Sequence, residues 1–61
     1  MNRIAMLRKE KGLSQISLSL KLNVSQKMIS AYENGKSEPS IATLMQMADI
    51  FNTSVDYIIG Y

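Results

Sequence analysis

The stretch from Asn23 to Lys36, NVSQKMISAYENGK, carries side chains of two kinds at helical spacing. Residues three and four apart share one face of a helix, so the two kinds separate onto opposite sides. One side is apolar and holds Val24, Met28, Ile29 and Tyr32. The other side holds small and hydrogen-bonding residues: Gln26, Lys27, Ser30, Ala31 and Asn34. Amide, ammonium and hydroxyl groups can bind a polar ligand by hydrogen bonds, so we interpret the second side as a recognition surface.

The composition argues against catalysis. The 61 residues include no cysteine and no histidine, which excludes thiolate chemistry, disulfides and the commonest general base near neutral pH. Five scattered carboxylates remain as metal ligands, so we expect neither a metal site nor a cofactor. No apolar run approaches the roughly 20 residues of a membrane span, and the charged N-terminus lacks the apolar core of a signal peptide. We expect a cytoplasmic protein that is not an enzyme.

Charge is distributed unevenly along the chain. Residues 1–37 hold all seven basic residues and two acidic ones, a net charge of +5, whereas residues 38–61 hold three acidic residues and no base. This asymmetry favours contact between the first half and a polyanion, because basic side chains release condensed counterions when they neutralise phosphates. Solvated helix faces explain the same distribution, so charge alone does not decide between the two interpretations.

Periodicity and turn residues predict five short helices and no strand. Four of the helices follow a serine that can cap a first helical turn: Ser14, Ser25, Ser40 and Ser54. Residues that tolerate a left-handed backbone follow the helices: Gly12, Asn23, Gly35, Asn52 and Gly60. In the fourth helix the predicted apolar stripe is Ile41, Leu44, Met45, Ala48 and Phe51. Turns this short indicate one compact all-α domain over residues 1–61.

The second and third predicted helices adjoin a tight turn at Asn23 and Val24. Leu18, Leu22 and Ile29 are spaced to pack around Val24, which is the arrangement of a helix-turn-helix. Such a pair can be merely a corner of a bundle. The polar side of the third helix favours DNA, because donors and small side chains suit the major groove.

Several short motifs carry a resemblance to a known family. They are LSQ at 13–15, VS at 24–25, ENGK at 33–36, PS at 39–40 and SVDYII at 54–59. In this order, over almost the whole chain, they resemble the Cro and lambda-repressor-like helix-turn-helix family, often called Xre-like. The resemblance implies a five-helix, operator-binding transcription regulator, usually dimeric, with its third helix in the major groove.

The resemblance also implies which residues touch DNA. The base-contacting positions are Gln26, Lys27, Ser30 and Ala31. The positions against the sugar-phosphate backbone are Gln15, Ser25, Asn34 and Lys36. A glutamine amide can pair with adenine, and a lysine can donate to guanine or to a phosphate. The alternatives are helix capping alone for the residues at helix starts and solvent exposure for the lysines.

Two further pairs follow from comparison with the family. The resemblance implies a partly buried ion pair between Arg8 and Glu33 that sets the angle of the third helix; the alternative is two independent surface charges. Ile16 and Leu20 stand where the family usually has polar residues, and one helical turn separates them. We interpret them as an exposed apolar pair that is either a scattered surface feature or a contact for a protein partner.

The C-terminal end is the candidate for self-association. Four apolar or aromatic residues there exceed the apparent need of the core: Ile50, Tyr57, Ile59 and Tyr61. A two-fold dimer through this end would place two third helices about 34 Å apart, which matches successive major grooves. Completion of the core by Ile50 and Ile59 is the alternative.

These observations predict a transcriptional regulator, more specifically a repressor, that binds a pseudo-palindromic operator in double-stranded DNA as a homodimer. A second hypothesis keeps the fold but changes the partner. In that hypothesis the chain is a protein-interaction module, such as an antitoxin or a bridging factor, that acts mainly through another protein.

Overall fold

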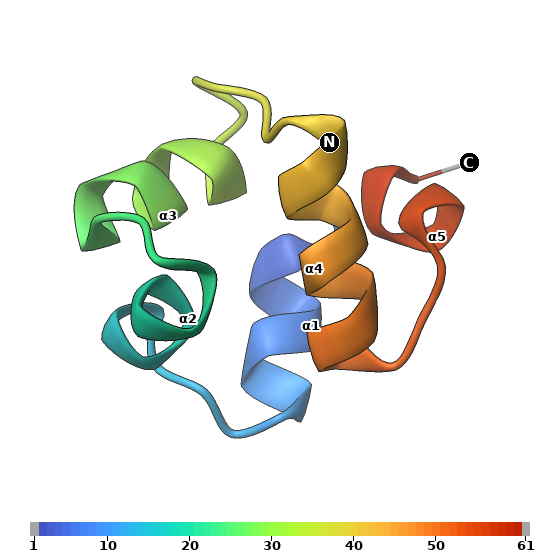
Figure 1. Ribbon diagram of the computed structural model, residues 1–61, viewed down its shortest axis with the longest axis horizontal. Coiled ribbons are helices and arrows are strands. Elements are labelled where there is room, and N and C mark those ends of the chain that lie inside the picture. Colours follow the sequence, from blue (N-terminus) through green and yellow to red (C-terminus); the bar gives the residue numbers. More distant parts are fainter. Residues whose placement is uncertain (1, 61) are drawn as a thin grey trace.

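The computed structural model describes residues 2–60, which contain five helices and no strand. The helices are α1 (Ile4–Glu10), α2 (Gln15–Leu22), α3 (Gln26–Glu33), α4 (Ile41–Phe51) and α5 (Val55–Ile59), as Figure 1 shows. The predicted all-α fold and its five helices are confirmed. Within residues 2–60, every helix is too short or too polar to cross a membrane.

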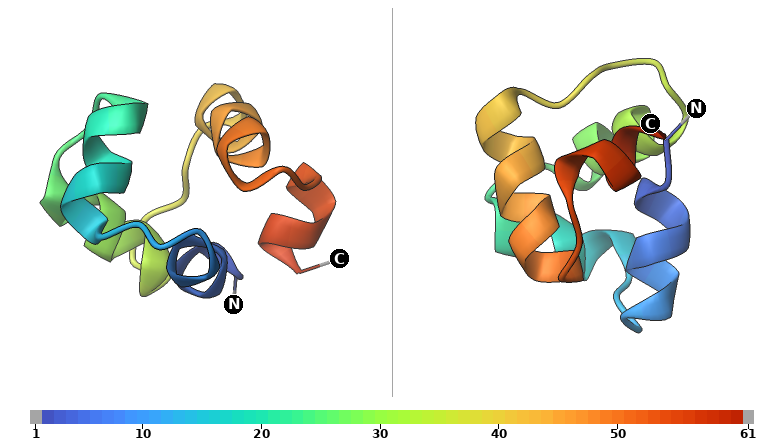
Figure 2. Two further views of the ribbon diagram at one scale, coloured as in Figure 1. Left: turned by 90° about the horizontal axis from the view of Figure 1, so that it is seen from below. Right: turned by 90° about the vertical axis from the view of Figure 1, so that its right-hand side faces the viewer.

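The helices form a bundle with α1 and α4 at its centre. The pair α2 and α3 lies on one side of them and α5 on the other (Figures 1 and 2). Packing contacts join α2 to α3, α4 to α5 and α2 to α4, while α1 contacts both α3 and α5. Helix α3 therefore lies at one edge of the molecule, away from α5.

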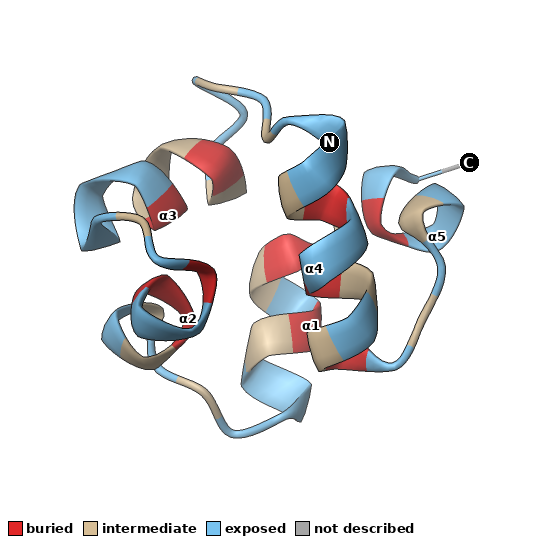
Figure 3. Cartoon of the chain, viewed as in Figure 1, coloured by how far each residue is buried: buried red, intermediate tan, exposed pale blue. Residues whose placement is uncertain are grey.

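The core draws buried apolar residues from all five helices, and Figure 3 marks the buried positions in red. Its buried members are Ile4, Leu7, Leu18, Leu22, Ile29, Tyr32, Leu44, Met47, Phe51 and Ile58. Burial of apolar surface is the main force that holds short helices together, because helices of this length are marginal on their own.

The apolar stripe predicted for α4 is partly wrong. Ile41 and Met45 are 69% and 59% exposed, whereas Met47, which the predicted stripe omits, is fully buried. The side of α4 that meets the rest of the bundle presents Leu44, Met47 and Phe51, spaced three and four apart. Apolar residues occur almost all round α4, so its periodicity is compatible with more than one stripe. The packing partners decide which one is buried.

Local capping chemistry explains where the helices begin and turn. The four predicted cap serines each accept a hydrogen bond from a backbone N–H three residues later, at 2.9 to 3.1 Å. Asn23 and Asn52 take left-handed conformations at the ends of α2 and α4, with φ of 58° and 55°. Asparagine is one of the few non-glycine residues that accept this conformation, so both predicted helix ends are confirmed.

The N-terminal segment is attached to α5. The backbone N–H of Arg3 donates to the carbonyl of Ile58, and its guanidinium donates to the carbonyl of Tyr57, both at 2.7 Å. The guanidinium also lies 4.4 Å from the centre of the Tyr57 ring, in a cation–π contact. One basic side chain from the N-terminal part of the sequence, that of Arg3, thus packs against the acidic C-terminal part.

Candidate nucleic-acid interface

The turn between α2 and α3 is tight and internally hydrogen-bonded. After α2 ends at Leu22, Asn23 reverses the chain, and the N–H of Val24 donates to the carbonyl of Ser19 at 3.0 Å. Val24 packs against the core, and Ser25 then caps α3. One left-handed residue, one apolar residue and one cap therefore fix the direction of α3 relative to α2.

The outer side of α3 is polar and open at its N-terminal turn. Gln26 and Lys27 are exposed, whereas Ser30 and Ala31 are half-buried. We call these four residues the α3 strip. Met28 belongs to the apolar side of the sequence pattern, yet it is 38% exposed. The buried part of α3 is therefore narrower than its apolar side and holds Ile29 and Tyr32.

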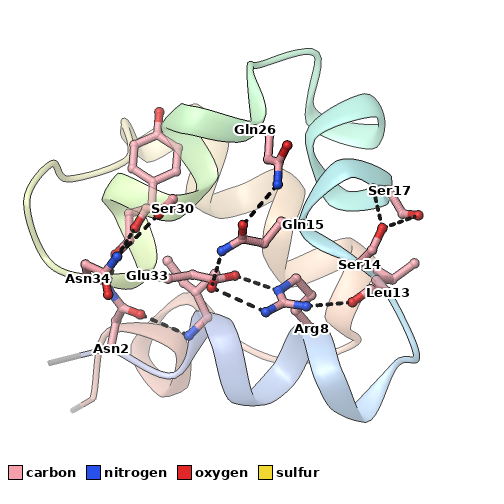
Figure 4. Close-up of polar contacts among 12 residues, drawn as sticks. Asn2, Arg8, Leu13, Ser14, Gln15, Ser17, Gln26, Ser30, Glu33 and Asn34 are labelled. Atoms are coloured by element: carbon pink, nitrogen blue, oxygen red, sulfur yellow. Dashed lines mark hydrogen bonds and ion pairs between the residues drawn. The ribbon is translucent and has the colours of Figure 1, made fainter.

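A chain of polar contacts leads from the interior to the α3 strip (Figure 4). The ion pair that the resemblance implies is present: Arg8 Nε lies 2.6 Å from Glu33 Oε2, and the two side chains are only 11% and 8% exposed. Arg8 also donates to the carbonyl of Leu13 at 2.9 Å. The amide nitrogen of Gln15 donates to Glu33 Oε1 at 3.0 Å, and that of Gln26 donates to Gln15 Oε1 at 3.3 Å.

Sequence reasoning missed the two hydrogen bonds of Gln15. They join it to Glu33, 18 residues away, and to Gln26, 11 residues away. Neither spacing places two residues on one helix face, so no periodic pattern reports them. Only the packing of α2 against α3 brings these side chains together.

The other residues predicted to touch the DNA backbone lie at the two ends of α3. Ser25 is exposed, and its hydroxyl oxygen accepts from a backbone N–H of the first turn. Asn34 turns its amide nitrogen back to Ser30, donating to the carbonyl at 2.9 Å and to the hydroxyl at 3.3 Å (Figure 4). Lys36 is exposed and follows Gly35, whose φ of 73° ends the helix.

The residues predicted for self-association differ in their exposure. Tyr57 and Ile59 on α5 are 42% and 38% exposed. Ile50 is half-buried and packs against the core, so little of it is left for a partner. Tyr61 lies outside the described residues. The available apolar surface at this end is therefore mainly that of α5.

Ile16 and Leu20 form the apolar pair predicted for α2. They are 55% and 77% exposed and lie one helical turn apart on the side of α2 opposite to the core. Leu18 and Leu22, in contrast, are buried. The prediction that this pair is exposed is confirmed.

Comparison with known proteins gives consistent matches. Residues 4–58 match the helix-turn-helix family model. An uncharacterized HTH-type transcriptional regulator of Bacillus subtilis, YqaE, is 36% identical over 52 residues, which cover 85% of this chain and 45% of that protein. The immunity repressor protein of Bacillus phage phi105 is 34% identical over 58 residues, covering 95% of this chain and 40% of the repressor.

A solved structure matches as well. A transcriptional regulator from Listeria innocua superposes with a TM-score of 0.86 at 33% identity, over 93% of this chain and 53% of the other. The chain spans less than half the length of the two sequence relatives and about half of this solved one. The similarity therefore concerns the helix-turn-helix part of longer proteins.

Proposed function

The chain belongs to the Cro and lambda-repressor-like helix-turn-helix family, and on that basis we propose that it is a sequence-specific DNA-binding regulator of transcription that acts as a repressor. The family is a class of DNA-binding regulators and not of enzymes. The observation that carries the proposal is the α3 strip, whose exposed glutamine and lysine project from a helix that the ion pair of Arg8 and Glu33 joins to α1. The repressor role is supported by the similarity to the immunity repressor of phage phi105.

In this proposal α3 lies in the major groove with its N-terminal turn toward the bases. Gln26 and Lys27 are exposed and long enough to reach base edges, as an amide to adenine and an ammonium to guanine or phosphate. Ser30 and Ala31 are half-buried and have short side chains, so they can reach only base edges that lie close to the helix. There the Ser30 hydroxyl can bond to either base pair, and the Ala31 methyl group can pack against a thymine methyl.

Phosphate contacts would position the helix. Gln15 and Ser25 lie at helix starts, where backbone N–H groups and the positive end of the helix dipole favour a phosphate. Lys36 supplies a point charge beyond the end of α3. Asn34 uses its amide nitrogen on both the carbonyl and the hydroxyl of Ser30, whereas Gln15 donates only once, to Glu33, and keeps one N–H. We therefore rank Asn34 as the weakest of the four contacts.

We further propose that the chain binds as a homodimer. Tyr57 and Ile59 supply exposed apolar surface on α5, at the opposite end of the bundle from α3. Ile50 contributes less because it packs on the core, and Tyr61 remains a candidate. A two-fold axis near α5 would present two copies of α3 to half-sites about 34 Å apart. Because the proposed function is DNA binding, we also propose that the protein is cytoplasmic.

Selection of bound sites from random-sequence duplex DNA tests the proposal. The expected result is an enriched pseudo-palindromic sequence, bound with an affinity that falls as salt rises, with a log-log slope near −0.9 for each neutralised phosphate. Light scattering with and without the selected duplex checks the dimer. Failure to enrich any sequence at low salt would remove the proposed function.

The exposed Ile16 and Leu20 support a second candidate function, a protein-interaction module with the same fold. An apolar contact of this kind would be nearly indifferent to salt and to replacement of Gln26 and Lys27. Replacing both apolar residues by glutamate would abolish binding to the protein partner and leave DNA binding unchanged. If the selection fails and such a partner binds, this second candidate replaces the first.

A further inference from the structure

Glu33 connects the partly buried ion pair to the polar side chains at the starts of α2 and α3. Its carboxylate accepts from the guanidinium of Arg8 and from the amide of Gln15, and its side chain is 8% exposed. We infer that Glu33 is a positioning residue that sets which end of the Gln26 amide faces a base, and so which base is preferred. This inference rests on the proposed function, in which Gln26 contacts DNA.

The carboxylate determines the orientation of the Gln15 amide. An ionised carboxylate accepts hydrogen bonds and donates none. Only the nitrogen end of the Gln15 amide can therefore face Glu33, and Nε2 lies 3.0 Å from Oε1. A flipped amide would place two oxygen acceptors against each other. The carbonyl oxygen of Gln15 is consequently directed away from Glu33.

The orientation of Gln15 in turn determines that of Gln26. The freed carbonyl oxygen of Gln15 is an acceptor, so Gln26 must offer its nitrogen, and its Nε2 lies 3.3 Å from Gln15 Oε1. Gln26 keeps its carbonyl oxygen and one N–H for a ligand. Figure 4 shows the nitrogen of Gln26 turned toward Gln15 and its oxygen turned away. The order of donor and acceptor on the α3 strip is thus fixed from inside the protein.

A fixed order distinguishes two bases that a mobile amide would confuse. In the major groove, adenine presents an acceptor at N7 beside a donor at N6, whereas guanine presents two acceptors, N7 and O6. An oriented amide can satisfy both groups of adenine. Against guanine its oxygen would face O6, which opposes two acceptors. An amide that is free to turn can donate to O6 instead. Glu33 therefore sharpens the preference for adenine over guanine without touching DNA.

The test begins with sites selected by the wild-type protein from random duplex DNA. The base pair whose preference disappears in Gln26→Ala marks the position that Gln26 contacts. The affinity for the selected duplex and for the same duplex with guanine at that position then gives an adenine-to-guanine ratio. A wild-type protein that selects no sequence overturns the proposed function, and this inference with it.

Two variants interrupt the connection at different points. In Glu33→Gln the new amide can turn, so the ratio should fall roughly twofold to tenfold, about the worth of one hydrogen bond in a bidentate contact. Gln15→Leu removes the intermediate link but leaves the ion pair of Arg8 intact, and should lower the ratio similarly. Because both act through one connection, the double variant should lose no more than either single variant.

Arg8→Lys is the control for a purely structural effect. It loosens the ion pair but leaves Glu33 an acceptor, so the melting temperature should fall while the adenine-to-guanine ratio stays at the wild-type value. All binding is measured where circular dichroism shows each variant folded. The inference is overturned if Glu33→Gln keeps the wild-type adenine-to-guanine ratio, or if it reduces the base preference at every position of the site to the same extent. It is also overturned if the effect of Glu33→Gln on the ratio adds to that of Gln15→Leu.

Discussion

Two parts of this molecule are built on the same local plan and differ in what they expose. The segment from Leu22 to Ile29 begins with a buried apolar residue, Leu22, and continues with Asn23 in the left-handed conformation. After one further residue Ser25 caps the next helix, and four residues after the cap Ile29 is fully buried. The segment from Phe51 to Ile58 repeats this plan position by position. We call them the α2–α3 unit and the α4–α5 unit.

The difference lies in the residues after the cap. In the α2–α3 unit they are Gln26 and Lys27, on a helix of eight residues; in the α4–α5 unit they are Val55 and Asp56, on a helix of five. Turn chemistry thus specifies a helix-turn-helix shape in both places, while the exposed side chains suit DNA in only one. A tight turn between two helices is therefore weak evidence for DNA binding until the outer face of the second helix is examined.

The largest expected effect should be common to both units. Ile29 and Ile58 are each fully buried at the position four residues after the cap. Replacing either by alanine should lower the free energy of unfolding by about 2–5 kcal/mol, because a cavity is left in the core. Urea denaturation followed by circular dichroism measures this. A loss well below that range at only one site would mean that the two units are not packed equivalently.

The next effect should separate the units. Lys27 and Asp56 occupy the same position, two residues after the cap. Lys27→Ala should weaken binding to the selected duplex by about 1–3 kcal/mol if it contacts a base, or reduce the salt slope by about 0.9 if it contacts a phosphate. Asp56→Ala should change the affinity less than about twofold, since exposed charges distant from DNA are screened. Equal losses from both replacements would contradict the assignment of α3 to the groove.

A smaller effect is expected at the two cap serines: both should matter for folding stability, and only one for DNA affinity. Ser25→Ala and Ser54→Ala each remove a cap hydrogen bond of 3.1 Å and should each cost about 1 kcal/mol of folding stability. Ser25→Ala should also weaken DNA binding when all molecules are folded, whereas Ser54→Ala should not. Thermal denaturation and titration with the duplex are the measurements. If the affinity is insensitive to Ser25, that serine is only a cap.

The smallest effect is expected at the turns themselves. Asn23 and Asn52 are exposed and left-handed, a conformation that glycine adopts without strain. Glycine at either position should therefore change the free energy of unfolding by no more than about 0.5 kcal/mol, the usual range for exposed sites. DNA affinity should not change. A large loss from Asn23→Gly alone would show that its side chain has a role beyond the turn.

The five helices were predictable because their signals are local. A serine three residues before an N–H that needs an acceptor, or an asparagine after the last helical turn, acts through neighbouring atoms only. The α4 stripe was not predictable to the same degree, since Met45 and Met47 are equally apolar and only the positions of α2 and α5 determine which is buried. For the α3 strip, sequence identified the residues but not that Ser30 and Ala31 are half-buried.

The sequence by itself determined the helix boundaries, the absence of cysteine and histidine and the placement of Gln26 and Lys27 on an outer face, because each depends on composition or on spacing within one helix. Only the tertiary structure decided that Gln15 joins Glu33 to Gln26. Hydrogen bonds form over about 3 Å, and that proximity between separate helices arises from packing, which no short-range pattern encodes.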